Sequence, residues 1–355
     1  MKLKKLFAGI LAVAMMATMA APAFAAKASS VTTTTGETKE IEDVSTVTLS
    51  KDYKLANNDE SNVSPAETIE FTVVKKSVKK AAKGVTVDTM PNVTVDKLAL
   101  AAGAAGGQKQ STTINLPDYT SVGVYTYEIT ENDGNKAGVT YRAEPITLVV
   151  TVVNGDTAGE FVRIPALHIG GVDATKGDTI ENTYSAGTLN IKKEVRGTMG
   201  DKSKNFMFTL TLNVAEGDTK VYPEKYNMTV TATGDNDLVN PTEITLGQAT
   251  TVYLHNDSTI RIANLPYGVT YTITEDNYTG EGDDNGYTTK VNGNEGLTTT
   301  GTVDASAEHV EFVNSKGGVV DTGVILDNAP YIALMMVVVA GAAVMIIKKR
   351  RHFED

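Results

Sequence analysis

Short runs in which apolar and polar residues alternate recur along most of the chain, separated by Gly, Asn and Asp. Clear examples are GVYTYEIT at 123–130, ITLVVTVV at 146–153 and FMFTLTL at 206–212. A period of two residues is typical of β-strands with one buried face. The segment 76–106 is less regular, and its alanines allow a short helix. The pattern predicts an all-β protein built from Ig-like β-sandwiches.

Several short sequence motifs occur twice, which indicates two tandem domains. GVYTYEITE ends at Glu131 and GVTYTITE ends at Glu275, and each follows a Leu-Pro phrase. Each half also opens on a strand that contains lysine and closes on a strand that contains asparagine. We therefore expect Ig-like domains at 45–184 and 185–316, with little freedom between them because the link at Ser185 is short.

Alternation places one polar residue at the end of each apolar row in the repeated strands. In the opening strands, Lys51 follows Val47 and Leu49, and Lys193 follows Leu189 and Ile191. In the middle and closing strands, the same reading selects these residues: Glu131, Glu275, Asn182 and Asn314. Such residues could simply mark strand ends, where polar side chains often turn to solvent. The same order of Lys, Glu and Asn in both halves instead favours a common role for the three residues in each domain.

A buried Lys⁺ next to a lone Glu⁻ is costly to remove from water. Burial lowers the pKa of an amine and raises that of a carboxyl group, so the pair can become a neutral amine and a neutral acid. The amine is then a nucleophile, and the carboxamide carbon of Asn is an electrophile. The acid can polarise the carbonyl and move protons to the departing ammonia. This chemistry predicts a Lys–Asn isopeptide amide inside each sandwich.

The two ends of the chain have targeting signals. Residues 1–25 combine basic residues, an apolar run and small residues, the pattern of a secretory signal peptide. Residues 26–44 are expected to be a linker. Residues 317–355 contain an uncharged apolar run at 331–347 that is followed by KKRR, as in a membrane span with a cytoplasmic basic tail.

These motifs together resemble the major backbone pilin of Gram-positive sortase-assembled pili, of the streptococcal T-antigen type. The resemblance rests on TLNIKKEVRGTMGDKSKNFMFTLTL, IRIANLPYGVTYTITEDNY and VEFVN in the second half, and on VTLSKDYKL, GVYTYEITE and TIENTYSAG in the first. It implies two Ig-like domains, each with one self-formed Lys–Asn bond between its first and last strands. Lys51 and Asn182 would be joined with Glu131 as the promoting acid, and Lys193 and Asn314 with Glu275.

The resemblance also implies a sorting signal and a polymerisation lysine. Val319-Val320-Asp321-Thr322-Gly323 keeps the Thr-Gly of the family motif but has Val in place of Pro. A sortase would cut between Thr322 and Gly323. The candidate acceptor on the next subunit is Lys176, one position from the family's lysine. Lys225, in VYPEKYN, ranks below it because Glu224 occupies the motif's lysine position.

Composition narrows the class of function. The formal net charge is −11, and the end segments hold several of the basic residues, which argues against nucleic acid as a partner. Cysteine is absent, so an exported chain must gain its durability without disulfides. The sequence has no pattern typical of a catalytic triad, zinc site or phosphate loop, and we expect no cofactor and no metal.

We therefore expect a non-enzymatic shaft subunit of a pilus, secreted and anchored at the cell wall from a plasma-membrane precursor. Its expected partners are a sortase, copies of itself, and peptidoglycan or other pilins. One alternative is a wall-anchored adhesin or minor pilin that does not polymerise. Another is a surface enzyme such as a glycosidase, although no pair of carboxylates is arranged for it.

Overall fold

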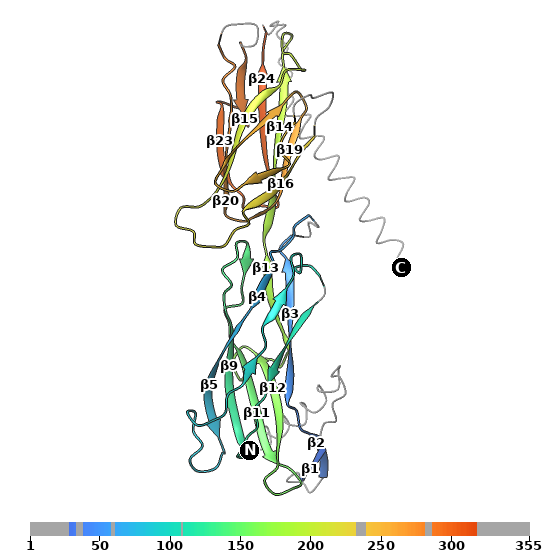
Figure 1. The fold of residues 1–355 in the computed structure, drawn as a ribbon, viewed down its shortest axis with the longest axis vertical. Helices are drawn as coiled ribbons and strands as arrows, with labels where there is room; N and C mark the ends of the chain where they lie inside the picture. The colour runs from blue at the N-terminus through green and yellow to red at the C-terminus, as the bar shows by residue number, and fades with distance from the viewer. Residues whose placement is uncertain are drawn as a thin grey trace, which may run out of the picture.

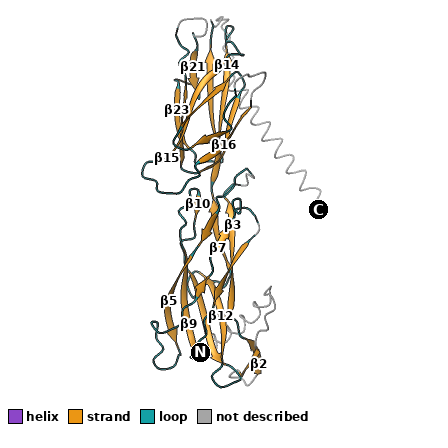
Figure 2. Cartoon of the chain, in the orientation of Figure 1, coloured by secondary structure: helices purple, strands orange, loops and turns teal. Residues whose placement is uncertain are grey.

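The structure, a computed structural model, describes residues 28–32, 38–57, 61–107, 109–231, 239–280 and 286–317. The segment 1–25 expected to be a signal peptide, the expected cleavage site at Thr322 and Gly323, and the apolar run at 331–347 lie outside the described residues. Within the described ranges there is no helix, and no segment that could cross a membrane as one. Two β-sandwiches follow one another along the long axis (Figures 1 and 2).

The first sandwich packs a five-stranded sheet against a four-stranded sheet. The five-stranded sheet has the order β10 (Val139–Thr140), β13 (Thr179–Tyr184), β3 (Thr46–Leu55), β8 (Gln110–Asn115) and β6 (Thr94–Val95). The four-stranded sheet has the order β12 (Phe161–Ile169), β11 (Ile146–Asn154), β9 (Gly123–Glu131) and β5 (Phe71–Lys79). Their inner faces form the apolar core, as the alternating pattern predicts.

Smaller elements flank this sandwich. A pair formed by β1 (Ala28–Thr32) and β2 (Thr38–Glu42) lies in the range expected as a linker, and a second pair is formed by β4 (Glu67–Ile69) and β7 (Leu98–Leu100). The short helix allowed at 76–106 was a wrong expectation. This segment consists of the end of β5, turns and the short strands β6 and β7, because its Gly and Pro residues interrupt any helical run.

The second sandwich repeats the plan with a seven-stranded and a four-stranded sheet. The larger sheet has the order β17 (Glu243–Thr245), β16 (Lys225–Thr231), β19 (Thr259–Pro266), β14 (Ala186–Arg196), β24 (Ala307–Ser315), β21 (Thr288–Val291) and β22 (Asn294–Glu295). The smaller sheet has the order β18 (Ala249–Leu254), β15 (Phe206–Val214), β20 (Val269–Glu275) and β23 (Thr298–Thr302). Its core is a continuous cluster of buried apolar residues.

In both sandwiches the opening strand lies parallel to the closing strand. β3 pairs with β13, and β14 pairs with β24. A parallel pair needs a long crossover connection, and here that connection is nearly the whole domain. The two ends of each domain therefore meet in the middle of one sheet.

Main-chain hydrogen bonds surround Ser185, the residue between the two sandwiches. Ser185 donates to the carbonyl of Gly138 at 2.8 Å and accepts from the N–H of Tyr267 at 3.1 Å. Gly138 has a φ of 75°, and a Cβ there would lie 2.5 Å from the carbonyl oxygen of Ser185, so this approach requires glycine. The junction is thus held by backbone as well as by side chains.

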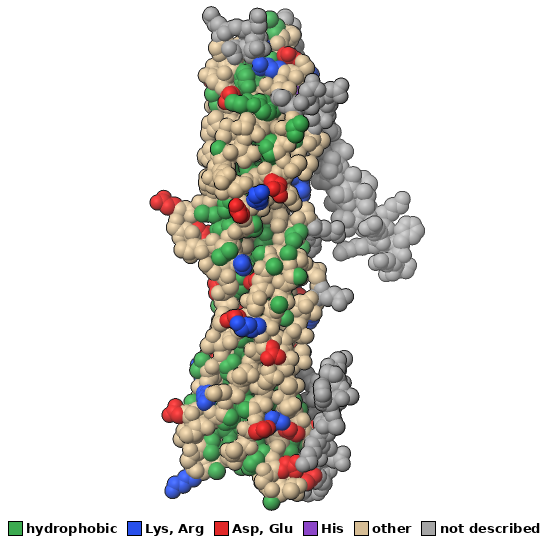
Figure 3. Space-filling model, viewed as in Figure 1, with side chains coloured by type: hydrophobic (Ala, Val, Ile, Leu, Met, Phe, Trp, Pro, Cys, Tyr) green, Lys and Arg blue, Asp and Glu red, His purple; other side chains and the backbone are tan. Residues whose placement is uncertain are grey.

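Two further contacts flank the junction. On one flank, Val221 donates its N–H to Asn135 at 2.7 Å and accepts from Ala137 at 3.0 Å. On the other, the Asn264 carboxamide accepts from the N–H of Val63 at 3.0 Å and donates to its carbonyl at 2.9 Å. The molecule is a straight rod, and the face in Figure 3 carries scattered charged side chains of both signs.

Candidate functional site

Each sandwich encloses one lysine, one glutamate and one asparagine. We call Lys51, Glu131 and Asn182 the first site, and Lys193, Glu275 and Asn314 the second site. Exposure is at most 5% for any of the six residues. The residues that alternation selected thus meet in the interior, in two separate groups.

The strand register explains why lysine and asparagine meet. Lys51 pairs with Ile180 across β3 and β13, and Asn182 lies two residues further along β13. Lys193 pairs with Phe312 across β14 and β24, and Asn314 lies two residues further along β24. An offset of two returns the side chain to the same face, so amine and carboxamide lie diagonally across neighbouring strands.

The acid comes from the facing sheet in both cases. Glu131 is the last residue of β9 and Glu275 is the last residue of β20. In the first site, Glu131 accepts from the Lys51 amine on Oε2 and from the Asn182 carboxamide on Oε1, the latter at 2.5 Å. In the second, Glu275 Oε1 accepts from Lys193 at 2.9 Å and from Asn314 at 2.6 Å.

One detail of the sequence prediction was wrong. The lysines do not end their buried rows, because Tyr53 follows Lys51 and Val195 follows Lys193 on the same face, and both are buried. Asn182 is likewise followed by buried Tyr184. The strands continue past the point at which the glutamate contacts the lysine and the asparagine. Buried side chains therefore lie before and after the polar residue on the same face of the strand.

Burial shifts the pKa values of these groups. Desolvation lowers the pKa of Lys193 to about 8 and also lowers the pKa of Lys51, against the opposing effect of each neighbouring carboxylate. Desolvation raises the pKa of Glu275, which Lys193 partly offsets. Both directions move the second site toward a neutral amine and a neutral acid.

The surroundings of the second site are aromatic. The Lys193 amine lies 4.3 Å from the ring centroid of Phe206 and 5.7 Å from that of Phe208. The Phe208 ring packs edge-on against Phe312 at 5.1 Å between centroids. Phe206 and Phe208 lie on β15, which pairs with the strand of Glu275, so these two buried rings form an apolar wall beside the amine.

The surroundings of the first site are more polar. Glu67, on β4, is buried, and Tyr141 donates to it at 2.5 Å. The field of Glu67 raises the pKa of Lys51, and that of Arg142 lowers it, though both act less than burial does. Alternation in the sequence also indicates Glu67 as an inward-facing acid, because it shares a face with Ile69 and Phe71. Tyr141 and Arg142 carry no such signal, since they lie outside strands.

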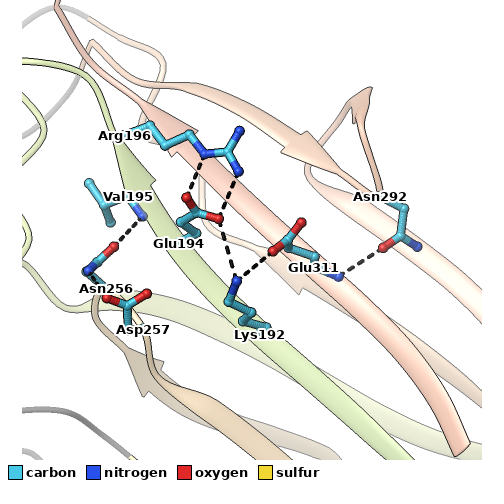
Figure 4. Close-up of polar contacts among 8 residues, drawn as sticks. All are labelled: Lys192, Glu194, Val195, Arg196, Asn256, Asp257, Asn292 and Glu311. Atoms are coloured by element: carbon cyan, nitrogen blue, oxygen red, sulfur yellow. Dashed lines mark hydrogen bonds and ion pairs between the residues drawn. The ribbon is translucent and has the colours of Figure 1, made fainter. Parts of the chain in front are cut away.

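Lys192 shows why only one of two adjacent lysines enters the second site. It points to the outer face of β14, where it pairs with Glu311 at 3.0 Å and approaches Glu194 at 3.6 Å (Figure 4). Arg196 completes this surface network by binding Glu194 at 2.7 Å. The network links β14 to β24 on the side opposite the buried lysine.

Lys176 lies in the connection between β12 and β13 and is partly exposed. It forms an isolated antiparallel bridge with His168. Lys225 is exposed at the start of β16 and pairs with Glu243 at 3.2 Å. In the described part of the chain, no three His, Cys, Asp or Glu side chains gather in a way that could hold a metal ion.

Comparison with known proteins finds a family match for each half of the chain. Residues 26–185 match the family described as "Spy0128-like isopeptide containing domain", and residues 187–316 match a domain of unknown function, DUF7601. A protein named "Pilin" from Streptococcus pyogenes serotype M1 is 34% identical over 233 residues. This match covers 61% of the chain and 64% of that protein, which is less than two thirds of its length.

Solved structures show the same architecture. The crystal structure of the major pilin from Streptococcus pyogenes has 25% sequence identity and a TM-score of 0.54, and the match covers 77% of this chain and 98% of that one. A major pilin protein from another serotype of the same species has 22% identity and a TM-score of 0.50, covering 78% and 98%. The second of these likenesses concerns the fold alone.

Proposed function

We propose that this chain is the structural shaft subunit of a sortase-built pilus. It is a relative of the streptococcal pilins, and its residues 26–185 belong to the Spy0128-like isopeptide containing domains. It would be divided at Ser185 into two domains, at 45–184 and 185–316. Each domain would be stabilised by a self-formed Lys–Asn bond. The protein is then a building unit and turns over no substrate.

The proposed bond forms by one balanced step in each site. The lysine Nζ, as a neutral amine, adds to Cγ of the asparagine carboxamide. The bond from Cγ to Nδ2 breaks, and one proton moves from Nζ through the glutamate to Nδ2, which leaves as ammonia. The product is an uncharged amide, which removes the cost of keeping two opposite charges in the core.

The buried contact of each acid with both reacting residues is the observation that supports this proposal. The same register offset recurs in two sandwiches whose connecting segments differ in length. An arrangement needed only for stability would be better served by apolar residues, since a buried ion pair seldom repays its desolvation.

The position of the bonds suits a fibre under tension. They would join the opening and closing strands of each domain, so force entering at one end would cross the domain through an amide. Only the segment 183–192 would then carry load between the two bonds. The hydrogen bonds around Ser185 lie along this segment and support it.

Intact mass tests the proposed bonds. Residues 27–316, produced as one chain, should weigh less than their sequence by two molecules of ammonia. Glu131→Ala and Glu275→Ala should each restore one of them. Glu128→Ala is the matched control, because this acid lies on the outer face of β9, where it pairs with Lys76 at 2.9 Å. Full mass in the unmutated chain would refute both bonds.

Assembly would use the two ends of the mature chain. A sortase would cut between Thr322 and Gly323 and transfer the threonine to Lys176 of the next subunit, or to peptidoglycan at the base. The precursor would wait in the plasma membrane and the product would stand on the cell wall. A wall-anchored adhesin or minor pilin that does not polymerise is the alternative, and the test of Lys176 separates the two.

A further inference from the structure

The Asn182 carboxamide in the first site has a fixed orientation. The main-chain N–H of Arg142 lies 3.1 Å from Asn182 Oδ1. A main-chain N–H can only donate, so the atom facing it must be the carboxamide oxygen. The carboxamide nitrogen therefore faces Glu131, at 2.5 Å. A flipped carboxamide would set two donors against each other in a buried place.

The fold explains why this donor is available. β10 pairs with β13 through Val139 opposite Tyr184 and Thr140 opposite Thr183, and then ends. Past that point the N–H of Arg142 bonds to the side chain of Asn182. A donor held by the backbone needs little reorganisation during a reaction.

We propose that the main-chain N–H of Arg142 is the oxyanion donor for bond formation in the first site. This inference rests on the proposed isopeptide bond. When Nζ of Lys51 adds to Cγ of Asn182, the carbonyl electron pair moves onto Oδ1, which faces Arg142. The pair then returns, the bond to Nδ2 breaks and ammonia leaves. Glu131 contacts both nitrogens, one on each oxygen, and relays the proton between them.

The second site lacks this main-chain contact among the described residues, and three buried polar atoms there have no partner. They are Asn314 Oδ1, Glu275 Oε2 and Thr289 Oγ1. Buried polar atoms are nearly always hydrogen-bonded, so three orphans in one site call for an explanation. Thr289 lies directly opposite Asn314 on the neighbouring strand β21. The two residues are 4% and 0% exposed, so their side chains share the interior face.

From these orphans we infer, as a second and independent assignment, that the hydroxyl of Thr289 is the donor to the Asn314 carbonyl oxygen. The two atoms do not bond to each other in this structure, so the contact requires a change in the χ1 rotamer of Thr289. Side chains directly opposite in an antiparallel pair have Cβ atoms about 4.5–5.5 Å apart, which leaves such a rotation enough reach to bring the hydroxyl toward the carboxamide. The two sites would thus share their acid chemistry and differ in their donor, a fixed amide in the first and a rotatable hydroxyl in the second.

Thr289→Val tests the second site, because valine keeps the shape and strand preference of threonine without the donor. The full chain is isolated unfolded and unlinked and then refolded, and the ammonia lost at each site is followed by mass spectrometry of the cross-linked peptides. Thr289→Val should slow bond formation in the second site by about 100-fold or more, the usual effect of losing such a donor. Thr289→Ser should keep most of the rate.

The first site in the same molecules is the internal control and should keep its rate. Bond formation in the second site of Thr289→Val at the unmutated rate would overturn the assignment of Thr289. An unmutated chain that loses no ammonia would instead refute the proposed function, so the two failures are distinguishable.

Arg142→Pro removes the N–H and should slow only the first site by a similar factor. Because proline also restricts the local backbone, a second measurement uses Lys51→Met, in which Asn182 cannot react. Hydrogen exchange of the Arg142 amide should be slow in that chain and at least tenfold faster after the further change Asn182→Leu, which removes the acceptor. An exchange rate that does not respond to Asn182→Leu would overturn the assignment of Arg142.

Discussion

Asn314 and Lys193 lie on neighbouring parallel strands, offset by two residues and facing the same interior. Asn182 and Lys51 repeat this relationship in the other sandwich. The offset puts amine and carboxamide on one diagonal, and the acid reaches both from the facing sheet. The pairing register of the opening and closing strands therefore brings together, in each sandwich, a lysine and an asparagine that are more than one hundred positions apart.

Asn314→Ala should lower the stability of the second domain sharply. A cross-link between residues 193 and 314 restricts the unfolded chain, and loop closure of this length is worth about 4–5 kcal/mol. The melting temperature of that domain should fall by about 10–20 °C in calorimetry. Asn190→Ala is the matched control, because Asn190 is the same residue type on the other face of β14 and makes one long hydrogen bond, at 3.4 Å. Equal losses in the two variants would contradict a bond at Asn314.

Lys192→Ala should leave the second bond intact and Lys193→Ala should abolish it. The two side chains are adjacent in sequence, but Lys192 pairs with Glu311 on the surface while Lys193 is fully buried. Mass spectrometry of each variant gives the answer. A missing bond in Lys192→Ala would mean that the surface network, and not the buried site, controls the reaction.

The unlinked variant Asn314→Ala should show a pH dependence that the linked protein lacks. Its Lys193 has a folded pKa of about 8, below the ordinary value of 10.5, so between these values the unfolded chain binds more protons. The free energy of unfolding should therefore rise with pH from 8, by up to about 3 kcal/mol at 10.5. Glu275, whose pKa is raised, acts in the opposite direction at lower pH, because its stabilising proton is lost as pH rises.

Urea unfolding between pH 7 and pH 10 measures this effect. The range ends at pH 10 because buried tyrosines with raised pKa values, such as Tyr127 at about 12, favour unfolding above it. The linked chain serves as the reference, since an amide does not titrate there. A flat profile in Asn314→Ala would show that Lys193 keeps its ordinary pKa in the core.

Lys176→Ala should abolish the high-molecular-weight ladder that wall extracts give on denaturing gels. The threonine acyl group from one subunit would then have no amine to join on the next. Lys225→Ala is the control, because this exposed lysine lies on β16 and pairs with Glu243. A ladder that persists in Lys176→Ala would remove this lysine from the scheme, and the absence of a ladder in the unmutated strain would favour the non-polymerising alternative.

Asn264→Ala should loosen the joint between the two domains. The Asn264 side chain pairs with both main-chain groups of Val63 and accepts from Tyr184 at 3.1 Å, and its φ of 59° is one that alanine adopts with difficulty. Small-angle scattering should show a broader range of end-to-end distances, with each domain still folded. An unchanged distribution would indicate that the main-chain contacts at Ser185 suffice.

Much of the candidate site could be predicted from the sequence, and particular residues show the limits. Alternation separates Lys193 from Lys192 and selects Glu275 and Asn314, because strand side chains obey a period of two wherever the partner strands lie. The same rule applied to Glu67 would have added it to the first site. Alternation could not show that the strands continue past Lys51 and Lys193, because the residue at which a strand ends depends on its pairing with neighbouring strands.

The sequence by itself determined which residues face the interior and that both halves repeat one plan, because these properties follow from local patterns. Only the tertiary structure decided that the opening and closing strands run side by side in parallel and that Arg142 and Thr289 lie next to the carboxamides. It also decided that Asn264 bridges the junction. These contacts join segments remote in the chain, and their geometry is set by packing in three dimensions.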